Sequence, residues 1–340
     1  MSRWEYLLKR LLLAVLVLFL VSMLTFFIAR VLPSDPAAAW VGPRPTVEQI
    51  AKARLTLGLD KPLYVQYGRY LLSVLRGDLG TSIKTRQPIV TELRTYLPAT
   101  LELVFVAMII AILVGLPMGV LSGANKGGWI DQLSRVISVA GVSIPTFFLG
   151  LVLQLVFFAR LGLLPIGGRV SNEIAINYPV QAITGFYTLD TLFTGNYVAF
   201  RDVLLHLILP AFTLSLYDIG LITRMTRSSM IEVLNEKYIL AARVAGLPRR
   251  TILFSLALKN AFIPTLTVIG LSFVYALTGS LLVEVIFAWP GLGTYITSSV
   301  LSLDFPVIVS VTLVVTVFYI AINLLLDMIQ AGVDPRVTLS

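Results

Sequence analysis

Residues 235–264 read NEKYILAARVAGLPRRTILFSLALKNAFIP and lie between two long apolar runs. This segment, called the elbow below, is basic and rich in small residues, whereas the runs beside it carry almost no charge. Apolar helices of that length fix a chain in a bilayer, while a basic segment between them stays in water. The pattern predicts membrane helices joined by an exposed helical elbow, which favours contact with a soluble partner.

Inside the elbow we expect two helices on either side of a tight turn. Residues 229–244 are mostly strong helix formers, and Gly246 suits a helix end that needs a positive φ. Pro248 suits the opening of a second helix at Arg249. The tip is expected to expose alanine, glycine and charge rather than bulky apolar groups, so that another protein could approach closely and pair with the arginines. The alternative is an ordinary loop whose charges only orient the protein.

The composition excludes a soluble globular domain. Of 340 residues, 57% are hydrophobic and 13% charged, and mean hydropathy is +0.89. Runs of roughly 20 residues, the length that crosses a bilayer, are Leu11–Ala29, Leu103–Asn125, Val136–Ala159, Val203–Thr223, Asn260–Val283 and Phe305–Leu326. The sequence therefore predicts an all-α polytopic membrane protein with six transmembrane helices. Trp289-Pro290-Gly291 interrupts the further run Val285–Leu303, which we interpret as an external turn with a re-entrant or surface segment.

Lys and Arg placement predicts the orientation. Most of them outside the first loop lie in the N-terminus and in the second and fourth loops, and the fifth loop has none. The first loop is basic but long, and long loops translocate largely regardless of charge. We expect a multi-pass protein of a prokaryotic inner membrane with both termini in the cytoplasm. The net charge of +8 follows from this bias and does not indicate nucleic-acid binding.

The chain divides into three parts. Residues 1–96 are expected to form the first transmembrane helix and an external cap, in which a helix capped by Thr46 precedes another over 62–75. Residues 97–332 form a five-helix core with an external loop at 160–203 and a cytoplasmic loop at 224–260. Residues 333–340 form a cytoplasmic tail.

Prolines and glycines inside the runs allow close helix packing or kinks. Pro117 and Pro145 are expected to interrupt their runs. The glycines that flank them favour packing over a kink that opens a pathway, and they are Gly115, Gly119, Gly141 and Gly150.

Ionisable residues within or beside the runs are candidate functional groups. We expect Glu102 at a membrane interface or in the first turn of a helix, His206 in a structural hydrogen bond and Asp218 paired with Arg224. Three further residues could line the pathway or its outer mouth, with packing as the alternative for the last: Glu284, Trp289 and Gln154.

The segment YILAARVAGL at 238–247 resembles the coupling motif of permeases of ATP-binding cassette (ABC) importers, in the dipeptide, oligopeptide and nickel group. It departs from the broader motif at Leu240, where many permeases have glutamate, and at Ala245, where many have aspartate. Further similar segments are LGLDKPL at 57–63, RGDLG at 76–80, LPATLEL at 97–103, HLILPA at 206–211, LKNAFIP at 258–264, VEVIF at 283–287, WPGLG at 289–293 and DPR at 334–336. Together they resemble the first, B-type permease of that group over the whole chain.

This resemblance implies the type I importer permease fold and a set of partners. These are a second homologous permease, two cytosolic ABC ATPases that clamp the elbow, an extracytoplasmic substrate-binding protein and the bilayer. It assigns ATPase coupling to Tyr238, Ala241, Ala242, Arg243, Ala245, Gly246, Leu247 and Arg249. ATP and Mg are expected on the ATPases, and no cofactor on this chain, which has no P-loop motif.

The implied function is a pore-forming permease that moves a di- or oligopeptide by alternating access, with oligosaccharide or nickel as alternative cargoes. An ion-coupled carrier is a remote alternative, because no acid is securely placed at the membrane midplane. A membrane enzyme is disfavoured, since one histidine, no cysteine and no H-E-x-x-H or G-x-S-x-G motif leave no evident catalytic residue or metal site.

Overall fold

The computed structural model describes residues 3–31, 36–42, 45–56 and 58–333. Within them the fold is helical, and the only strand-type pairing is a bridge between Thr81 and Pro88. The long helices are α1 (Arg3–Val31), α5 (Ile89–Ala124), α10 (Tyr197–Leu234), α13 (Leu258–Ile286) and α15 (Phe305–Val333). The shorter helices are α2 (Pro36–Val41), α3 (Val47–Thr56), α4 (Leu63–Leu75), α6 (Trp129–Ser143), α7 (Thr146–Leu153), α8 (Asn172–Asn177), α9 (Tyr187–Phe193), α11 (Lys237–Val244), α12 (Arg249–Thr251) and α14 (Leu292–Leu301). Two segments are π-helical, η1 (Gln154–Arg160) and η2 (Ile252–Ala257).

Five of the six predicted spans are confirmed as helices long and apolar enough to cross a membrane. The third is not the continuous helix expected over 136–159, because α6 and the α7–η1 segment meet at a bend of 104°. The break follows from Pro145, since the residue before a proline is driven out of the helical region and Ile144 has φ −78° and ψ 122°. The expected interruption at Pro117 is wrong, because α5 continues through it.

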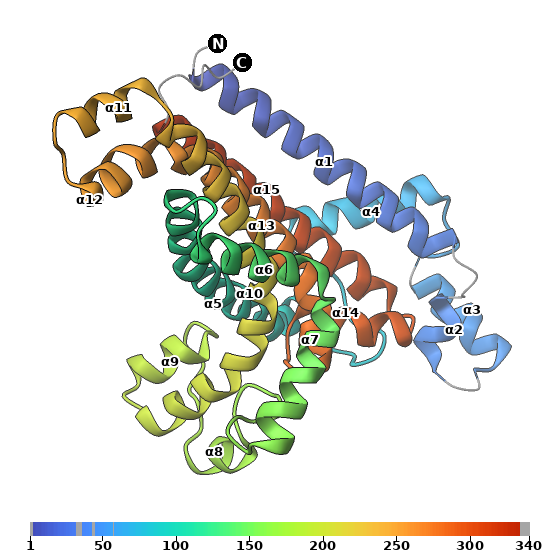
Figure 1. Ribbon diagram of the computed structural model, residues 1–340. Coiled ribbons are helices and arrows are strands. Elements are labelled where there is room, and N and C mark those ends of the chain that lie inside the picture. Colours follow the sequence, from blue (N-terminus) through green and yellow to red (C-terminus); the bar gives the residue numbers. More distant parts are fainter. Residues whose placement is uncertain (1–2, 32–35, 43–44, 57, 334–340) are drawn as a thin grey trace.

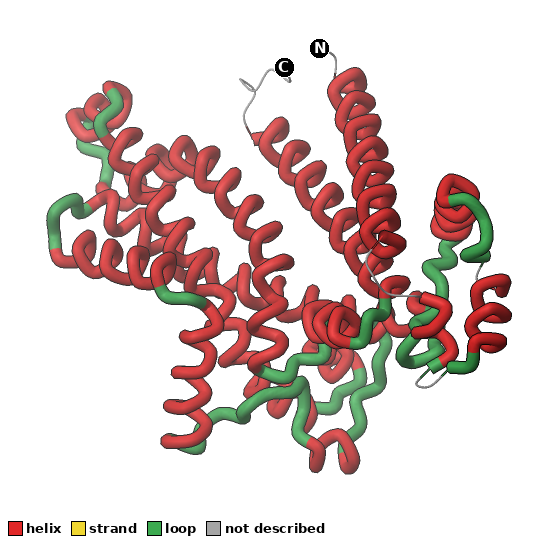
Figure 2. The backbone as a smooth tube through the Cα atoms, turned by 90° about the vertical axis from the view of Figure 1, so that its right-hand side faces the viewer, coloured by secondary structure: helices red, strands yellow, loops and turns green. Residues whose placement is uncertain are grey.

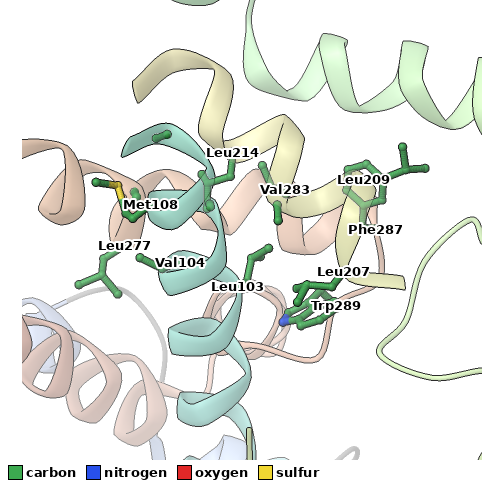
Figure 3. Close-up of a cluster of buried hydrophobic side chains, with 14 of the residues drawn as sticks. Leu103, Val104, Met108, Leu207, Leu209, Leu214, Leu277, Val283, Phe287 and Trp289 are labelled. Carbon is green, nitrogen blue, oxygen red and sulfur yellow. The ribbon is translucent and has the colours of Figure 1, made fainter. Parts of the chain in front are cut away.

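The core lies where α5, α10 and α13 pack together (Figure 1). Figure 3 shows the side chains that meet there, with Leu103 from α5, Leu207 from α10, Val283 from α13, and Trp289 just beyond α13. Close packing of α5 on α10 requires glycine, because a Cβ at Gly119 would lie 2.4 Å from the Cβ of Thr226. The packing interpretation of this glycine is therefore confirmed.

Helix α1 lies at the edge of the molecule, against α15 and the cap helix α4 (Figures 1 and 2). An ion pair of 3.0 Å joins Arg10 to Asp327, and the hydroxyls of Ser22 and Tyr67 lie 2.8 Å apart. Most of its leucines face outward, as expected for a helix in contact with lipid. The tail segment at 334–336 noted in the sequence lies outside the described residues.

The external cap has the two helices that the sequence predicts, α3 and α4. Thr46 caps α3 as expected, since its Oγ1 accepts a hydrogen bond from Gln49 N at 3.2 Å. The Gln49 side chain in turn accepts from Thr46 N at 2.9 Å, which completes a capping box. The N-terminal end of α1, the C-terminal end of α15 and the α11–α12 elbow point to one side of the molecule, while α8 and α9 lie on the opposite side (Figure 1).

Candidate functional site

The part of segment 235–264 that lies outside the helical core consists of α11, a turn and α12, and the name elbow is restricted to it from here on. It leads through η2 into α13. The helix expected across 229–244 is interrupted, because α10 ends at Leu234 and α11 begins at Lys237. Glu236, with φ −69° and ψ 146°, takes the extended backbone of a helix N-cap. The elbow is therefore a separate short helix, set at an angle to the long membrane helix before it (Figure 1).

Gly246 ends α11 in the way that the sequence predicts. Its φ of +73° is left-handed, Gly246 N donates to Arg243 O at 3.0 Å, and Leu247 N donates to Ala242 O at 3.1 Å. This pair of hydrogen bonds is the Schellman motif, which glycine favours because it lacks a Cβ. No atom lies within 4 Å of the place where a Cβ would be, so backbone conformation rather than close contact requires the glycine.

One side of α11 packs against the rest of the chain. Ile239 and Ala242 are buried in a cluster that includes Val120 of α5, Met230 of α10 and Leu253 of η2. Ala242 was expected at an exposed tip, and that placement is wrong. It faces inward because it lies three residues from Ile239, on the same side of the helix.

The other side of α11 is exposed and apolar. Leu240 is 61% exposed, Val244 82% and Leu247 43%. Ala241 and Ala245 are exposed beside them. The expectation that the tip shows no bulky apolar group is therefore wrong. Leu240 and Val244 are four residues apart and share one face of the helix. The helical period of the sequence could therefore have predicted this apolar face.

Polar contacts anchor the elbow to two membrane helices. Asn260 Nδ2 of α13 donates to the Tyr238 hydroxyl at 2.6 Å. Arg249 Nη2 donates to Asn125 Oδ1, just beyond α5, at 2.8 Å. Arg243 makes a long contact of 3.5 Å with the carbonyl of Leu234. These contacts link the elbow to α13 and to the C-terminal end of α5.

The sequence suggested that Glu284 lines the outer mouth of the pathway, and the structure shows that it does not. It is fully buried, and its carboxylate accepts hydrogen bonds from Thr100 Oγ1 at 2.7 Å, Ser280 Oγ at 3.1 Å, Gly293 N at 2.6 Å and Thr294 N at 3.2 Å. The carboxylate is held inside because four donors from three elements converge on it, which offsets the cost of burial. It fixes α5, α13 and α14 to one another.

Trp289 is likewise buried rather than exposed at a mouth. Its Nε1 donates to Ala99 O of α5 at 2.8 Å. Gln154 Nε2 donates to Ile166 O at 2.7 Å and to Ile286 O at 3.0 Å, so it ties the loop after η1 to the end of α13. The packing alternative for Gln154 is confirmed, and its role in a pathway stays a prediction.

Of the other ionisable candidates, Glu102 is buried and forms an ion pair with Arg169. It also accepts from Thr188 N and Oγ1, both at 2.7 Å, so it is held by protein groups, and its place at a membrane interface stays a prediction. His206 Nδ1 lies 2.8 Å from the carbonyl of Asp202, four residues earlier, which confirms a structural hydrogen bond.

Asp218 differs from the acids above. The expected ion pair with Arg224 is absent from the part of the chain that the structure describes, where Arg224 is exposed and Asp218 buried. Its Oδ1 is buried without a hydrogen-bond partner. The sequence placed Asp218 inside an apolar run, but it could not predict which helices pack around its side chain.

Comparisons with known proteins agree with this architecture. Residues 115–339 match the family described as binding-protein-dependent transport system inner membrane component, and residues 3–104 match the N-terminal family of such membrane components. The chain is 43% identical over 337 residues to the probable D,D-dipeptide transport system permease protein DdpB of Escherichia coli, covering 99% of this chain and 98% of that protein.

Two further relatives also match over nearly the whole chain. The dipeptide transport system permease protein DppB of Alkalihalophilus pseudofirmus is 41% identical over 332 residues, with 98% of each chain covered. The glutathione transport system permease protein GsiC of Salmonella paratyphi A is 36% identical over 333 residues, again with 98% of each chain covered. These full-length matches, together with the membrane helices and the elbow, show that this chain belongs to the inner-membrane permease components of binding-protein-dependent ABC transport systems, in the group that includes the dipeptide permeases, and is a transport subunit rather than an enzyme.

Proposed function

We propose that this chain forms half of the pore of an ATP-driven importer of di- or oligopeptides. It pairs with a second, homologous permease, receives solute from an extracytoplasmic binding protein and is driven by two cytosolic ATPases. The observation that carries this proposal is the exposed apolar face of α11, made of Leu240, Val244 and Leu247. A large apolar surface outside the membrane-spanning region, held in place by contacts behind it, is typical of a protein-binding surface.

The anchors of the elbow support a mechanical role. An ATPase that closes on α11 moves Tyr238 and Arg249, which are hydrogen-bonded to Asn260 and Asn125. Because these partners lie at the ends of α13 and α5, the movement reaches two of the three core helices. Alternating access then follows from the relative motion of packed helices.

Docking of an ATPase on this surface also supports an orientation with the elbow in the cytoplasm. ATP is in the cytoplasm, so the elbow faces it, and the ends of α1 and α15 on that side face it too (Figure 1). The basic residues of the elbow fit this orientation. The external cap and the α8–α9 region then lie outside, where a binding protein delivers its solute.

A peptide is the favoured cargo. The names of three relatives specify D,D-dipeptide, dipeptide and glutathione, which are all peptides or built of amino acids in amide linkage. Oligosaccharide and nickel, the alternatives of the wider group, have no such support.

The test is a Val244→Asp variant in the complete complex. A charge at the centre of an apolar contact has to be desolvated when the ATPase binds, so we expect loss of ATPase co-purification and of dipeptide uptake. Val47→Asp is the matched control, because Val47 is 86% exposed but lies in the external cap. Normal ATPase binding and uptake by the Val244 variant would overturn docking at this face.

A further inference from the structure

A cavity of about 430 Å³ lies beside the bend between α6 and α7. Three elements form its walls, namely the bend itself, α10 and α13. The residues that matter for the argument are Ile144, Thr146, Tyr217, Asp218, Tyr275 and Thr278. The volume lies within the range of about 300–1,000 Å³ that is common for small-molecule sites.

The break at Pro145 creates this space. Ile144 takes an extended conformation before the proline, so α7 leaves the direction of α6 by 104°. A straight helix would continue α6, whereas the bend leaves room beside α10 and α13. The cavity is therefore a consequence of the local sequence rather than of loose packing.

Asp218 brings a carboxylate to this cavity. Its side chain is 2% exposed, its Oδ1 has no hydrogen-bond partner, and it makes no ion pair within the described residues. Two other buried acids of the helices have partners by contrast. Glu102 accepts two hydrogen bonds in addition to its ion pair with Arg169, and Glu284 accepts four hydrogen bonds. A buried carboxylate oxygen without a hydrogen-bond partner is unfavourable, so the partner of Oδ1 is expected to come from outside the chain.

The position of Asp218 along α10 fits a solute route. It lies 16 residues before Leu234 and 21 after Tyr197, which correspond to about 24 Å and about 32 Å of helix. Asp218 also lies inside the predicted span Val203–Thr223, so its carboxylate is in the part of α10 that is expected to cross the membrane. Acids at that depth are typical of substrate and ion pathways.

We propose that this cavity is a solute subsite in which Asp218 receives the ammonium group of a peptide. Three hydroxyl-bearing residues of the same cavity, Thr146, Tyr217 and Tyr275, can hydrogen-bond to the amide and carboxylate groups of the peptide. Thr278 lines the cavity but donates its hydroxyl to Tyr275 O, so it is not assigned to the peptide. No group of three His, Asp or Glu side chains that could hold a metal ion occurs in the described ranges. An ammonium is therefore favoured over a metal cation. This inference rests on the proposed function and assigns a residue to it.

The test uses cysteine protection in the permease complex without its binding protein. This chain has no native cysteine, so Thr278→Cys carries the only thiol that reports on it. Alanyl-alanine at about ten times its half-protecting concentration is expected to slow labelling by N-ethylmaleimide about tenfold by mass action. N-acetyl-alanyl-alanine, which lacks the ammonium, is expected to give no protection. Val47→Cys, in the external cap, is the control that neither peptide should affect.

The charge is tested in the same assay. Asp218→Asn keeps the size of the Asp218 side chain and removes its charge. When it is combined with Thr278→Cys, protection by alanyl-alanine should disappear. Asp218→Glu in the same background keeps the charge and should retain part of the protection. Equal protection by the two peptides would overturn the role of the carboxylate. So would undiminished protection by alanyl-alanine when Asp218→Asn is present. Should either Asp218 variant fail to assemble, the comparison of the two peptides on Thr278→Cys alone still decides.

Transport separates this inference from the proposed function. If the complete complex imports alanyl-alanine but Thr278→Cys is never protected, the subsite is wrong and the importer remains. If the complex imports no peptide, both are wrong. A loss of the second permease from the Asp218→Asn complex, with Thr278→Cys unprotected by alanyl-alanine in the parent, would instead show that Asp218 pairs with that subunit.

Discussion

Arg227 of α10 binds both carboxylate oxygens of Asp131 of α6, with Nε 2.5 Å from Oδ1 and Nη2 2.9 Å from Oδ2. The carboxylate also accepts from Ser122 Oγ of α5 at 2.7 Å and from Gly127 N at 2.9 Å. Asp131 is buried, and Ser122 and Arg227 lie near the C-terminal ends of α5 and α10, at Ala124 and Leu234. One acid thus joins three helices next to the segment on which an ATPase is proposed to act.

Asp131→Asn should weaken this junction. The amide cannot accept from all of the donors and leaves the guanidinium without its counter-charge, so we expect a loss of about 3 kcal/mol of stability. Thermal unfolding of the purified permease measures the change. Asp60→Asn is the matched control, because Asp60 pairs with Lys61 at the surface and should not shift the transition. An Asp131 variant as stable as the control would contradict the structural role of the pair.

Gly119→Ala should destabilise the contact between α5 and α10. The new Cβ would lie 2.4 Å from the Cβ of Thr226 and 2.8 Å from the carbonyl of Thr223, and neither the backbone nor a β-branched side chain yields easily. Gly68→Ala in α4 is the control, since no atom lies within 4 Å of its Cβ position. Alanine favours a helix by about 1 kcal/mol over glycine, so the control should be neutral or stabilising. A melting temperature of Gly119→Ala that is as high as that of the parent, with Gly68→Ala unchanged or raised, would contradict the close packing of α5 on α10.

Gly246 separates backbone geometry from surface contact in the elbow. Gly246→Ala places a Cβ in the left-handed region and should cost about 1 kcal/mol locally, whereas Gly246→Asn should be better tolerated. Amide hydrogen exchange of α11 measures the loss directly. If alanine and asparagine slow uptake equally while exchange is unchanged, the glycine is needed for contact with a partner rather than for its φ.

The elements that the sequence predicted correctly depend on local signals. Apolar run length located five spans, Thr46 located the start of α3, and Gly246 located the end of α11. Each of these features is decided by residues within a few positions along the chain. Local rules were therefore sufficient for them.

The wrong predictions concern features that depend on residues far apart in the sequence. Pro117 and Pro145 look alike in sequence, yet α5 continues through the first and the chain bends at the second. Glu284 follows an apolar run, but donors from Thr100 and Gly293 bury it. Tertiary packing determines which donors surround a carboxylate, and the hydrophobic periodicity of the sequence does not predict it.

The burial of Glu284 leads to a graded prediction. Its Oε2 accepts from two backbone N–H groups, of Gly293 and Thr294, whereas its Oε1 accepts from the hydroxyls of Thr100 and Ser280. Backbone donors cannot reverse their polarity, but hydroxyls can rotate and accept instead. Glu284→Gln can therefore direct its oxygen to the N–H groups and its amide to the hydroxyls, and should lose only about 1 kcal/mol.

Glu284→Ala has no such rearrangement. It leaves two buried N–H groups without an acceptor and opens a cavity between α13 and α14, so we expect a loss of about 3 kcal/mol or more. Thermal unfolding gives the order of the variants, and limited proteolysis reports on the segment between α13 and α15. Glu232→Ala, at an exposed position of α10, is the control and should match the parent. Equal losses for the glutamine and alanine variants would show that the charge of Glu284, and not its pattern of hydrogen bonds, holds this segment in place.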